Sequence, residues 1–142
     1  DSIDQLAKAK SITITLTGDE EIWLWGSAEL LERSIINLLS NATKYSDVGQ
    51  PIHIEVAREN NFASIAIKER GYGIKVDELP HIFERFRRQK HTEQSGPKGA
   101  GLGLNFVKVV IAKHKGNIEV QSNYGEGSTF TIKLPILNNE TL

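Results

Sequence analysis

Three glycines at alternate positions, Gly99, Gly101 and Gly103, lead into an apolar segment whose periodicity predicts a helix at about 102–114. Glycine permits backbone conformations and close approaches that a Cβ would forbid. A glycine-rich turn that opens a helix directs several unpaired N–H groups, and the positive end of the helix dipole, to one place. The run is therefore typical of a phosphate-binding loop, although glycine-rich loops also serve as ordinary turns.

A second group of polar residues follows the spacing of one helical face. Asn37, Asn41 and Lys44 stand at i, i+4 and i+7 in a segment, 28–45, that is predicted to be helical. Asparagine is a mediocre helix former, so two of them one turn apart suggest a use for their amides. An Asn carbonyl oxygen suits Mg²⁺, and a lysine adds charge near phosphates. A solvated helix face explains the same spacing.

A carboxylate and two glycines follow a predicted strand. Glu69 ends that strand, and Gly71 and Gly73 come directly after it. A carboxylate there could accept a hydrogen bond from the exocyclic amine of adenine, whereas guanine presents an acceptor oxygen and would be repelled. An exposed glutamate at an ordinary strand exit accounts for the pattern equally well.

Two further segments carry weaker signals. Phe83 and Phe86 are typical of core or lid anchors, and 125–130 (GEGSTF) alone predicts a tight hairpin turn. The basic residues beside the phenylalanines are either solvated or placed to meet a triphosphate; they are Arg85, Arg87, Arg88 and Lys90.

The composition is that of one ordinary globular domain: 142 residues, 39% hydrophobic and 25% charged. A net charge of −1 lacks the footprint of a nucleic-acid binder, and no apolar run approaches the ~20 residues of a membrane span. We therefore expect neither nucleic acid nor direct membrane contact. The absence of cysteine excludes a disulfide framework and fits a cytoplasmic location. Because the chain starts at Asp1 and has no methionine, we expect a fragment of a longer protein.

The elements that must position these residues follow from hydrophobic periodicity. Strands are predicted at 12–17, 22–25, 51–57, 63–69, 117–122 and 128–136, helices at 28–45 and 102–114, and short helical turns at 76–86. Two long helices among strands indicate a mixed sheet covered on one face, a two-layer α/β sandwich.

The order and spacing of five segments are more specific than any one of them. NLLSNATKY, GYGI, IFERF, GAGLGL and GEGSTF, in this sequence, resemble the ATP-binding catalytic domain of two-component sensor histidine kinases, from about Ile12 to Pro135. The resemblance implies a Bergerat-type α/β sandwich, ATP and Mg²⁺ as cofactors, and one domain over 1–142. It also implies that 1–10 is the end of a linker from a dimerisation and phosphoacceptor hairpin, 87–100 the ATP lid and 137–142 a tail.

The resemblance also implies site residues. Asn41 would bind Mg²⁺ with help from Asn37, and Lys44 would act at the phosphates, so these three are the expected catalytic residues. The expected nucleotide-binding residues are Asn41, Lys44, Tyr45, Glu69, Gly71, Gly73, Ile74, Phe83, Arg87, Arg88, Gly99, Gly101, Leu102, Gly103, Leu104 and Thr129.

The sequence departs from the family pattern at Glu69 and Arg70, where Asp-Asn is usual. Glutamate keeps the acceptor but is one methylene longer, so we expect ATP binding to be retained and weakened. Hydrolysing relatives place a glutamate one turn before the metal-binding asparagine, where it can act as a general base for water. Here that position is Asn37, which cannot take a proton, and this favours phosphoryl transfer over hydrolysis.

A transferase needs an acceptor, and none of His53, His81, His91 and His114 stands in the helical His-acid context that the family phosphorylates. We expect the acceptor on a helical dimerisation domain of the same protein. The parent is expected to be a homodimer, either free in the cytoplasm or membrane-anchored, with a response regulator acting downstream. An alternative is a degenerate binding or sensing module in which Glu69 and Arg70 have abolished catalysis. A Rossmann domain is rejected, because GAGLG lacks the G-x-G-x-x-G spacing and the preceding strand.

Overall fold

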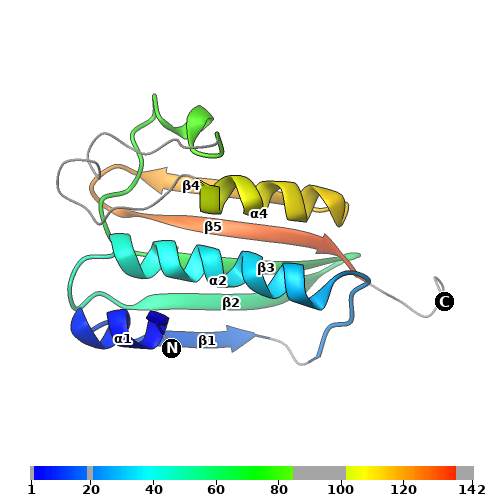
Figure 1. Ribbon diagram of the computed structural model, residues 1–142, viewed down its shortest axis with the longest axis horizontal. Helices are drawn as coiled ribbons and strands as arrows, with labels where there is room; N and C mark the ends of the chain where they lie inside the picture. The colour runs from blue at the N-terminus through cyan, green and yellow to red at the C-terminus, as the bar shows by residue number, and fades with distance from the viewer. Residues whose placement is uncertain (1, 19–20, 85–101, 137–142) are drawn as a thin grey trace.

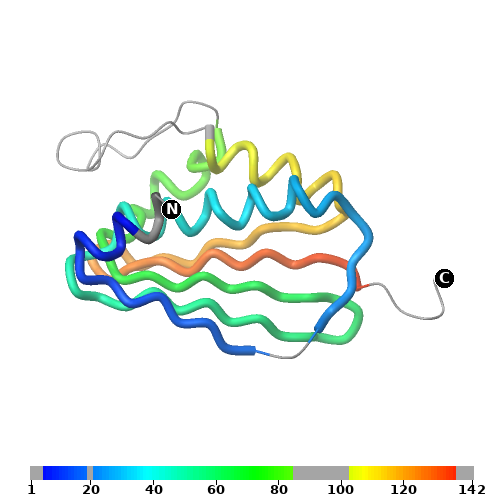
Figure 2. The backbone as a smooth tube through the Cα atoms, turned by 60° about the horizontal axis from the view of Figure 1, so that its bottom comes forward, coloured from blue at the N-terminus to red at the C-terminus, as the bar shows by residue number. Residues whose placement is uncertain are grey.

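The computed structural model describes residues 2–18, 21–84 and 102–136. In this part of the chain, helices cover one face of a five-stranded sheet, and the opposite face is open (Figures 1 and 2). The elements in chain order are α1 (Ser2–Ala9), β1 (Ile14–Gly18), α2 (Ala28–Tyr45), β2 (Ile52–Glu59), β3 (Phe62–Glu69), η1 (Leu79–His81), α4 (Leu102–Lys113), β4 (Asn117–Asn123) and β5 (Gly127–Pro135). The predicted two-layer α/β sandwich is confirmed.

The sheet is mixed, with the strand order β1-β2-β3-β5-β4. β1 runs parallel to β2, and the remaining neighbours are antiparallel. The register pairs Glu69 with Ser128 and Lys68 with Thr129. Because successive side chains of a strand point to opposite faces, Glu69 and Ser128 share one face, and Lys68 and Thr129 share the other.

The hydrophobic core lies between the sheet and the helices. Apolar side chains stand at alternate positions of the central strands, so that each strand contributes one apolar face to the core. The side chains with 1% exposure or less are Ile52, Ile67, Ile111, Ile132 and Val107, together with the hydroxyl residues Ser34 and Thr43. Leu38 and Ala42 of α2 complete the contact with the sheet. This packing fixes α2 and α4 against the same face.

Helix α2 begins and ends where the sequence predicts. Ser27 caps it, because its hydroxyl accepts a hydrogen bond from the N–H of Leu30 at 3.1 Å. Two buried hydroxyls, of Ser34 and Thr43, donate to the carbonyls four residues earlier, which satisfies them inside the core. The apolar arc therefore packs on the sheet and leaves the polar arc of Asn37 and Asn41 half-buried.

The prediction of a strand at 22–25 is wrong. These residues alternate between exposed and half-buried side chains, yet they lie in a connection that rises from the sheet layer to the start of α2 (Figure 2). The pattern of a strand is present without a partner strand to pair with. Trp23 and Trp25 consequently remain 68% and 70% exposed.

The other predicted elements are observed, with ends shifted by one or two residues. The helical turns expected around Pro80 form the 3₁₀-helix η1. The segment predicted as the end of a linker, 1–10, contains α1, whose Ala7 is buried in the core. The expected lid, 87–100, and tail, 137–142, lie outside the described residues. Among the described helices, none is long and apolar enough to cross a membrane.

Candidate functional site

The asparagine face of α2 lies next to the beginning of α4. A Cβ built on Gly103 would stand 4.0 Å from Nδ2 of Asn41 and would meet no nearer heavy atom. The first turn of α4, with its unpaired N–H groups, is thus brought beside the predicted metal ligand. The structure thereby joins two of the predicted groups, one from 28–45 and one from the glycine run.

A buried carboxyl group lies at the end of β3, on the helix-covered face. Glu69 is only 9% exposed, and its Oε2 has no hydrogen-bond partner among the described residues. Burial raises the pKa of Glu69 to about 7. Hydrogen bonds from Ser128 act in the opposite direction, and the nearby charge of Asp47 raises the pKa further. The unpartnered oxygen indicates a place for a ligand that can hydrogen-bond with it.

The two glycines after Glu69 allow close backbone packing. A Cβ on Gly71 would collide with the carbonyl oxygen of Tyr45 and would stand 2.8 Å from Oε2 of Glu69. Gly73 has φ of +71° and lies against the backbone of Asn123, so a side chain there would be strained and crowded. The predicted glycines therefore bring the end of α2 and the turn after β4 close to Glu69.

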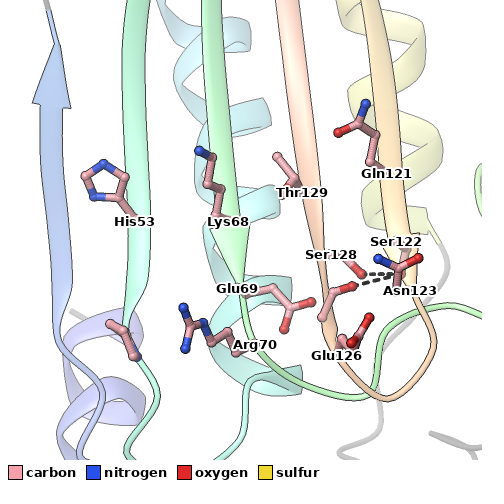
Figure 3. A pocket seen from close by; sticks show the side chains of 12 residues that line it. His53, Lys68, Glu69, Arg70, Gln121, Ser122, Asn123, Glu126, Ser128 and Thr129 are labelled. Carbon is pink, nitrogen blue, oxygen red and sulfur yellow. Dashed lines mark hydrogen bonds between the residues drawn. The ribbon is translucent and has the colours of Figure 1, made fainter.

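Three serines connect Glu69 with its surroundings. Ser122 and Ser128, neighbours on β4 and β5, are joined by a hydrogen bond of 2.8 Å between their hydroxyls (Figure 3). Ser122 also accepts from the N–H of Ile74, at 2.7 Å, and so places this buried residue beside the site. Ser46, at the C-terminal cap of α2, donates to the carbonyl of Ala42 at 2.6 Å. The sequence analysis did not single out any of these serines.

Lys10, which directly follows α1, forms hydrogen bonds with the C-terminal end of α2. The ammonium group of Lys10 donates to the carbonyl oxygens of Thr43, at 3.0 Å, and of Lys44, at 2.9 Å. A cation at these unpaired carbonyls also interacts favourably with the helix dipole. Partial burial is the main cause that lowers the pKa of Lys10. Lys10 therefore holds the backbone that carries Lys44 and Tyr45.

Of the other predicted site residues, three lie on or near α4, and several lie outside the described residues. The carbonyl of Phe83 accepts from the amide of Asn105 at 3.1 Å, and its ring lies 5.5 Å from the ammonium of Lys108. Leu104 packs on the core, and Leu102 begins α4. Outside the described residues lie Arg85, Phe86, Arg87, Arg88, Lys90, Gly99 and Gly101.

Thr129 lies on the other face of the sheet. With His53, Lys68 and Gln121 it forms a row across four strands, seen in Figure 3 with the helices behind the sheet. This row helps to line a cavity of about 500 Å³ at the strand ends, which Glu69, Ser122 and Ser128 also line. Asn41 and Gly103 belong to the helix layer behind the sheet. The contact with Glu69 is made by Ser128 and not by Thr129.

The comparisons agree with this architecture. A family profile described as histidine kinase-, DNA gyrase B-, and HSP90-like ATPase matches residues 26–138. Sensor histidine kinase RppB of Synechocystis is 38% identical over 118 residues, which are 83% of this chain and 26% of RppB. Sensor-like histidine kinase SenX3 of Mycobacterium tuberculosis is 42% identical over 112 residues, 79% of this chain and 27% of SenX3.

Solved structures have the same fold. The mycobacterial sensor histidine kinase MprB superposes with a TM-score of 0.79 and 31% identity, covering 95% of this chain and 89% of that one. Full-length ShkA in complex with AMPPNP has a TM-score of 0.79 and 21% identity, covering 96% of this chain and 29% of ShkA, and supports the fold alone. The chain spans about a quarter of the length of RppB and SenX3.

The fold, the glycine turns and the asparagines of α2 thus agree with the family profile, which matches most of the chain. The chain belongs to the family of histidine kinase-, DNA gyrase B- and HSP90-like ATPases, and within it to the ATP-binding domains of sensor histidine kinases.

Proposed function

We propose that this domain binds Mg-ATP and donates the γ-phosphoryl group to a histidine on a separate dimerisation domain of the same sensor kinase. The observation that carries the proposal is the meeting of Asn41 with the first turn of α4, on the same face as the unpartnered oxygen of Glu69. An amide oxygen, helix N–H groups and a buried acceptor suit a metal ion, phosphates and an amine-bearing base, in that order.

Each part of the nucleotide would have a defined partner. Asn41 would ligate Mg²⁺ with help from Asn37, and the ion, when bound, would neutralise phosphate charge. Lys44 would stabilise the phosphates beside the start of α4. Glu69 would accept a hydrogen bond from the adenine amine, which satisfies its orphan oxygen. The other proposed contacts are Tyr45, Gly71, Gly73, Ile74, Phe83, Arg87, Arg88, Gly99, Gly101, Leu102, Gly103 and Leu104.

Transfer is favoured over hydrolysis because the side chain one turn before Asn41 is an amide. Asn37 is half-buried on the same face and cannot take a proton from water. Catalysis would therefore consist of positioning and charge stabilisation. We expect Asn37→Glu to increase the slow hydrolysis of ATP, measured as phosphate release, and Asn37→Gln to leave it unchanged. Equal rates in both variants would count against this assignment.

The described histidines are engaged in structural contacts. His53 bonds with two threonine hydroxyls of β1, His81 with Glu84, and His114 with a backbone carbonyl and the N–H of Ser27. His91 lies outside the described residues. These contacts support a phosphoryl acceptor on another part of the parent protein. We propose that the parent is a homodimer whose kinase part faces the cytoplasm and that it passes the phosphoryl group to a response regulator.

Calorimetry with Mg-ATP tests the binding step. At pH 8 we expect saturable binding of one nucleotide per chain, and Glu69→Asp, which restores the usual residue, should bind at least as tightly. Absence of binding in both proteins would overturn the proposal. Binding by Glu69→Asp alone would support the second candidate function, a degenerate module, which the departure at Glu69 and Arg70 favours.

Phosphotransfer distinguishes a kinase from such a module. When this domain is joined to a helical hairpin with its histidine, ³²P from γ-labelled ATP should appear on the hairpin as an acid-labile phosphoryl group. The domain alone should not retain label. A hairpin that stays unlabelled, although ATP binds, would contradict the kinase function.

A further inference from the structure

We propose that Glu69 reads the purine of a bound nucleotide in two protonation states. As a carboxylate it accepts a hydrogen bond from the 6-amino group of adenine, and as a carboxylic acid it donates one to the 6-carbonyl of guanine or hypoxanthine. This inference rests on the proposed function, because it concerns the base contact of the same site. Base selectivity should then change with pH, whereas a permanently ionised carboxylate would exclude 6-oxopurines at every pH.

The geometry leaves one oxygen of Glu69 for the base. Ser128 hydrogen-bonds with the carboxyl group, while Oε2 is buried without a partner among the described residues. Oε2 lies against Gly71, only 2.8 Å from where a Cβ would stand. The longer side chain of glutamate thus fits because position 71 lacks a side chain. A ligand that offers either a donor or an acceptor can satisfy Oε2, depending on whether it carries a proton.

No described cation pairs directly with Oε2. Lys10 is the nearby cation whose charge acts on Glu69, but its ammonium donates to the carbonyl oxygens of Thr43 and Lys44. Asp47, in the loop after α2, places a negative charge on the same side. Lys68 lies exposed on the opposite face, Arg70 is exposed beyond the strand end, and the neighbours from β4 and β5 are the neutral residues Ser122 and Ser128.

The consequence is a carboxyl group with both states accessible near neutrality. Burial outweighs the serine hydrogen bonds and raises the pKa of Glu69 to about 7. If each state binds one class of base, the apparent affinity for that class follows the population of its state. Between pH 8 and pH 6 the affinity for an adenine nucleotide should fall about tenfold, and that for a 6-oxopurine nucleotide should rise about tenfold.

The experiment compares Mg-ATP with Mg-ITP, whose base has a carbonyl in place of the 6-amino group. Dissociation constants are measured by calorimetry at pH 6, 7 and 8 with saturating Mg²⁺. Because both nucleotides carry the same triphosphate, titration of the phosphates cancels in the ratio of the two constants. We expect the preference for ATP over ITP to fall by about a hundredfold from pH 8 to pH 6.

The matched control is Glu69→Gln, whose amide both donates and accepts and does not titrate. Its ATP/ITP ratio should not change with pH, and a change as large as in the wild type would overturn the assignment to Glu69. Should this variant not fold, the side-chain carboxyl of Glu69 can be titrated by ¹³C NMR in the wild type. Its midpoint should fall when ATP binds and rise when ITP binds, and equal midpoints would overturn the inference.

The outcomes separate this inference from the proposed function. If ATP binds at pH 8 and the ATP/ITP ratio stays constant within about twofold, the two-state reading is wrong and the proposed function stands. If ATP does not bind at any pH, the proposed function fails, and the inference fails with it.

Discussion

The two faces of the sheet differ sharply at the ends of β3 and β5, although the residues involved are adjacent in sequence. On the covered face, Glu69 and Ser128 are buried, and the carboxyl group has a pKa of about 7. On the open face, Lys68 is exposed beside Thr129 in a polar row (Figure 3). The comparison teaches that burial by the end of α2, more than residue type, gives this strand end its chemistry.

The largest effect on stability is expected at Gly71, where the backbone packs most closely on the covered face. Gly71→Ala places a methyl group against the carbonyl of Tyr45 and beside Oε2 of Glu69, and backbone atoms cannot move aside as a side chain can. We expect a loss of about 4 kcal/mol in the free energy of unfolding, or failure to fold. The measurement is chemical denaturation monitored by circular dichroism.

Gly125→Ala is the matched control for Gly71→Ala. Gly125 has φ of +88° in the β4–β5 turn and no heavy atom within 4 Å of the Cβ position. It therefore tests backbone strain without a collision, and the expected cost is about 1 kcal/mol. Equal costs at the two glycines would show that the covered face is not the more constrained one.

The second prediction concerns the pH dependence of stability without nucleotide. The folded-state pKa of Glu69, about 7, lies above its ordinary value of 4.5, so the folded protein binds more protons than the unfolded chain between these values. The corresponding stability is present below pH 4.5 and is lost as the pH rises through 7. Relative to Glu69→Gln, the wild type should lose about 2.5 kcal/mol between pH 5 and pH 8.

Lys68→Gln provides the contrast from the open face. The exposed ammonium of Lys68 should contribute little, so this variant should follow the wild type within about 0.5 kcal/mol at every pH. Denaturation midpoints at pH 5, 6, 7 and 8 supply the comparison. If the wild type and Glu69→Gln changed in parallel with pH, the carboxyl group would not be buried as described.

The sequence predicted correctly the features that depend on a local pattern of residues. It did not predict those that depend on which strands pair with one another. The bounds of α2 followed from hydrophobic periodicity, because that pattern is local. The strand predicted at 22–25 failed because alternation cannot reveal whether a partner strand exists. For a similar reason, Ser128, which contacts Glu69, was not singled out.

Which of two adjacent residues faces Glu69 is set by the β3–β5 register, and that register joins segments about sixty residues apart. The raised pKa of Glu69 was equally invisible, since it results from burial by elements distant in sequence. The contact between Asn41 and Gly103 could be expected only through the family resemblance. Spacing within each segment predicts its chemistry, and tertiary packing decides which segments meet.

The third prediction compares amides on the two layers. Asn41→Ala should raise the dissociation constant of Mg-ATP roughly ten- to hundredfold, because it removes the proposed metal ligand. Gln121→Ala, in the exposed polar row, should leave the constant within about twofold. Calorimetry at pH 8 measures both. A large effect of Gln121→Ala would place the nucleotide at the polar row of the open face.

The smallest expected effect is the difference in stability between substitutions at two adjacent residues of β5. Ser128→Ala removes a hydroxyl that hydrogen-bonds with Glu69 and with Ser122, and should cost about 1 kcal/mol. Thr129→Val keeps the shape and the β-branched side chain on the open face, and should cost less than about 0.5 kcal/mol. Denaturation at pH 7 measures both costs.

The same two substitutions should also differ in their effect on the titration of Glu69, which stability alone cannot show. The hydroxyl of Ser128 lowers the pKa of Glu69, so its removal should move the ¹³C NMR midpoint to a still higher pH. Thr129→Val should leave that midpoint unchanged, because its side chain points to the opposite face. A shift in Thr129→Val and none in Ser128→Ala would mean that the register places the two residues the other way round. The assignment of the two faces would then be reversed at the strand end where the base is proposed to bind.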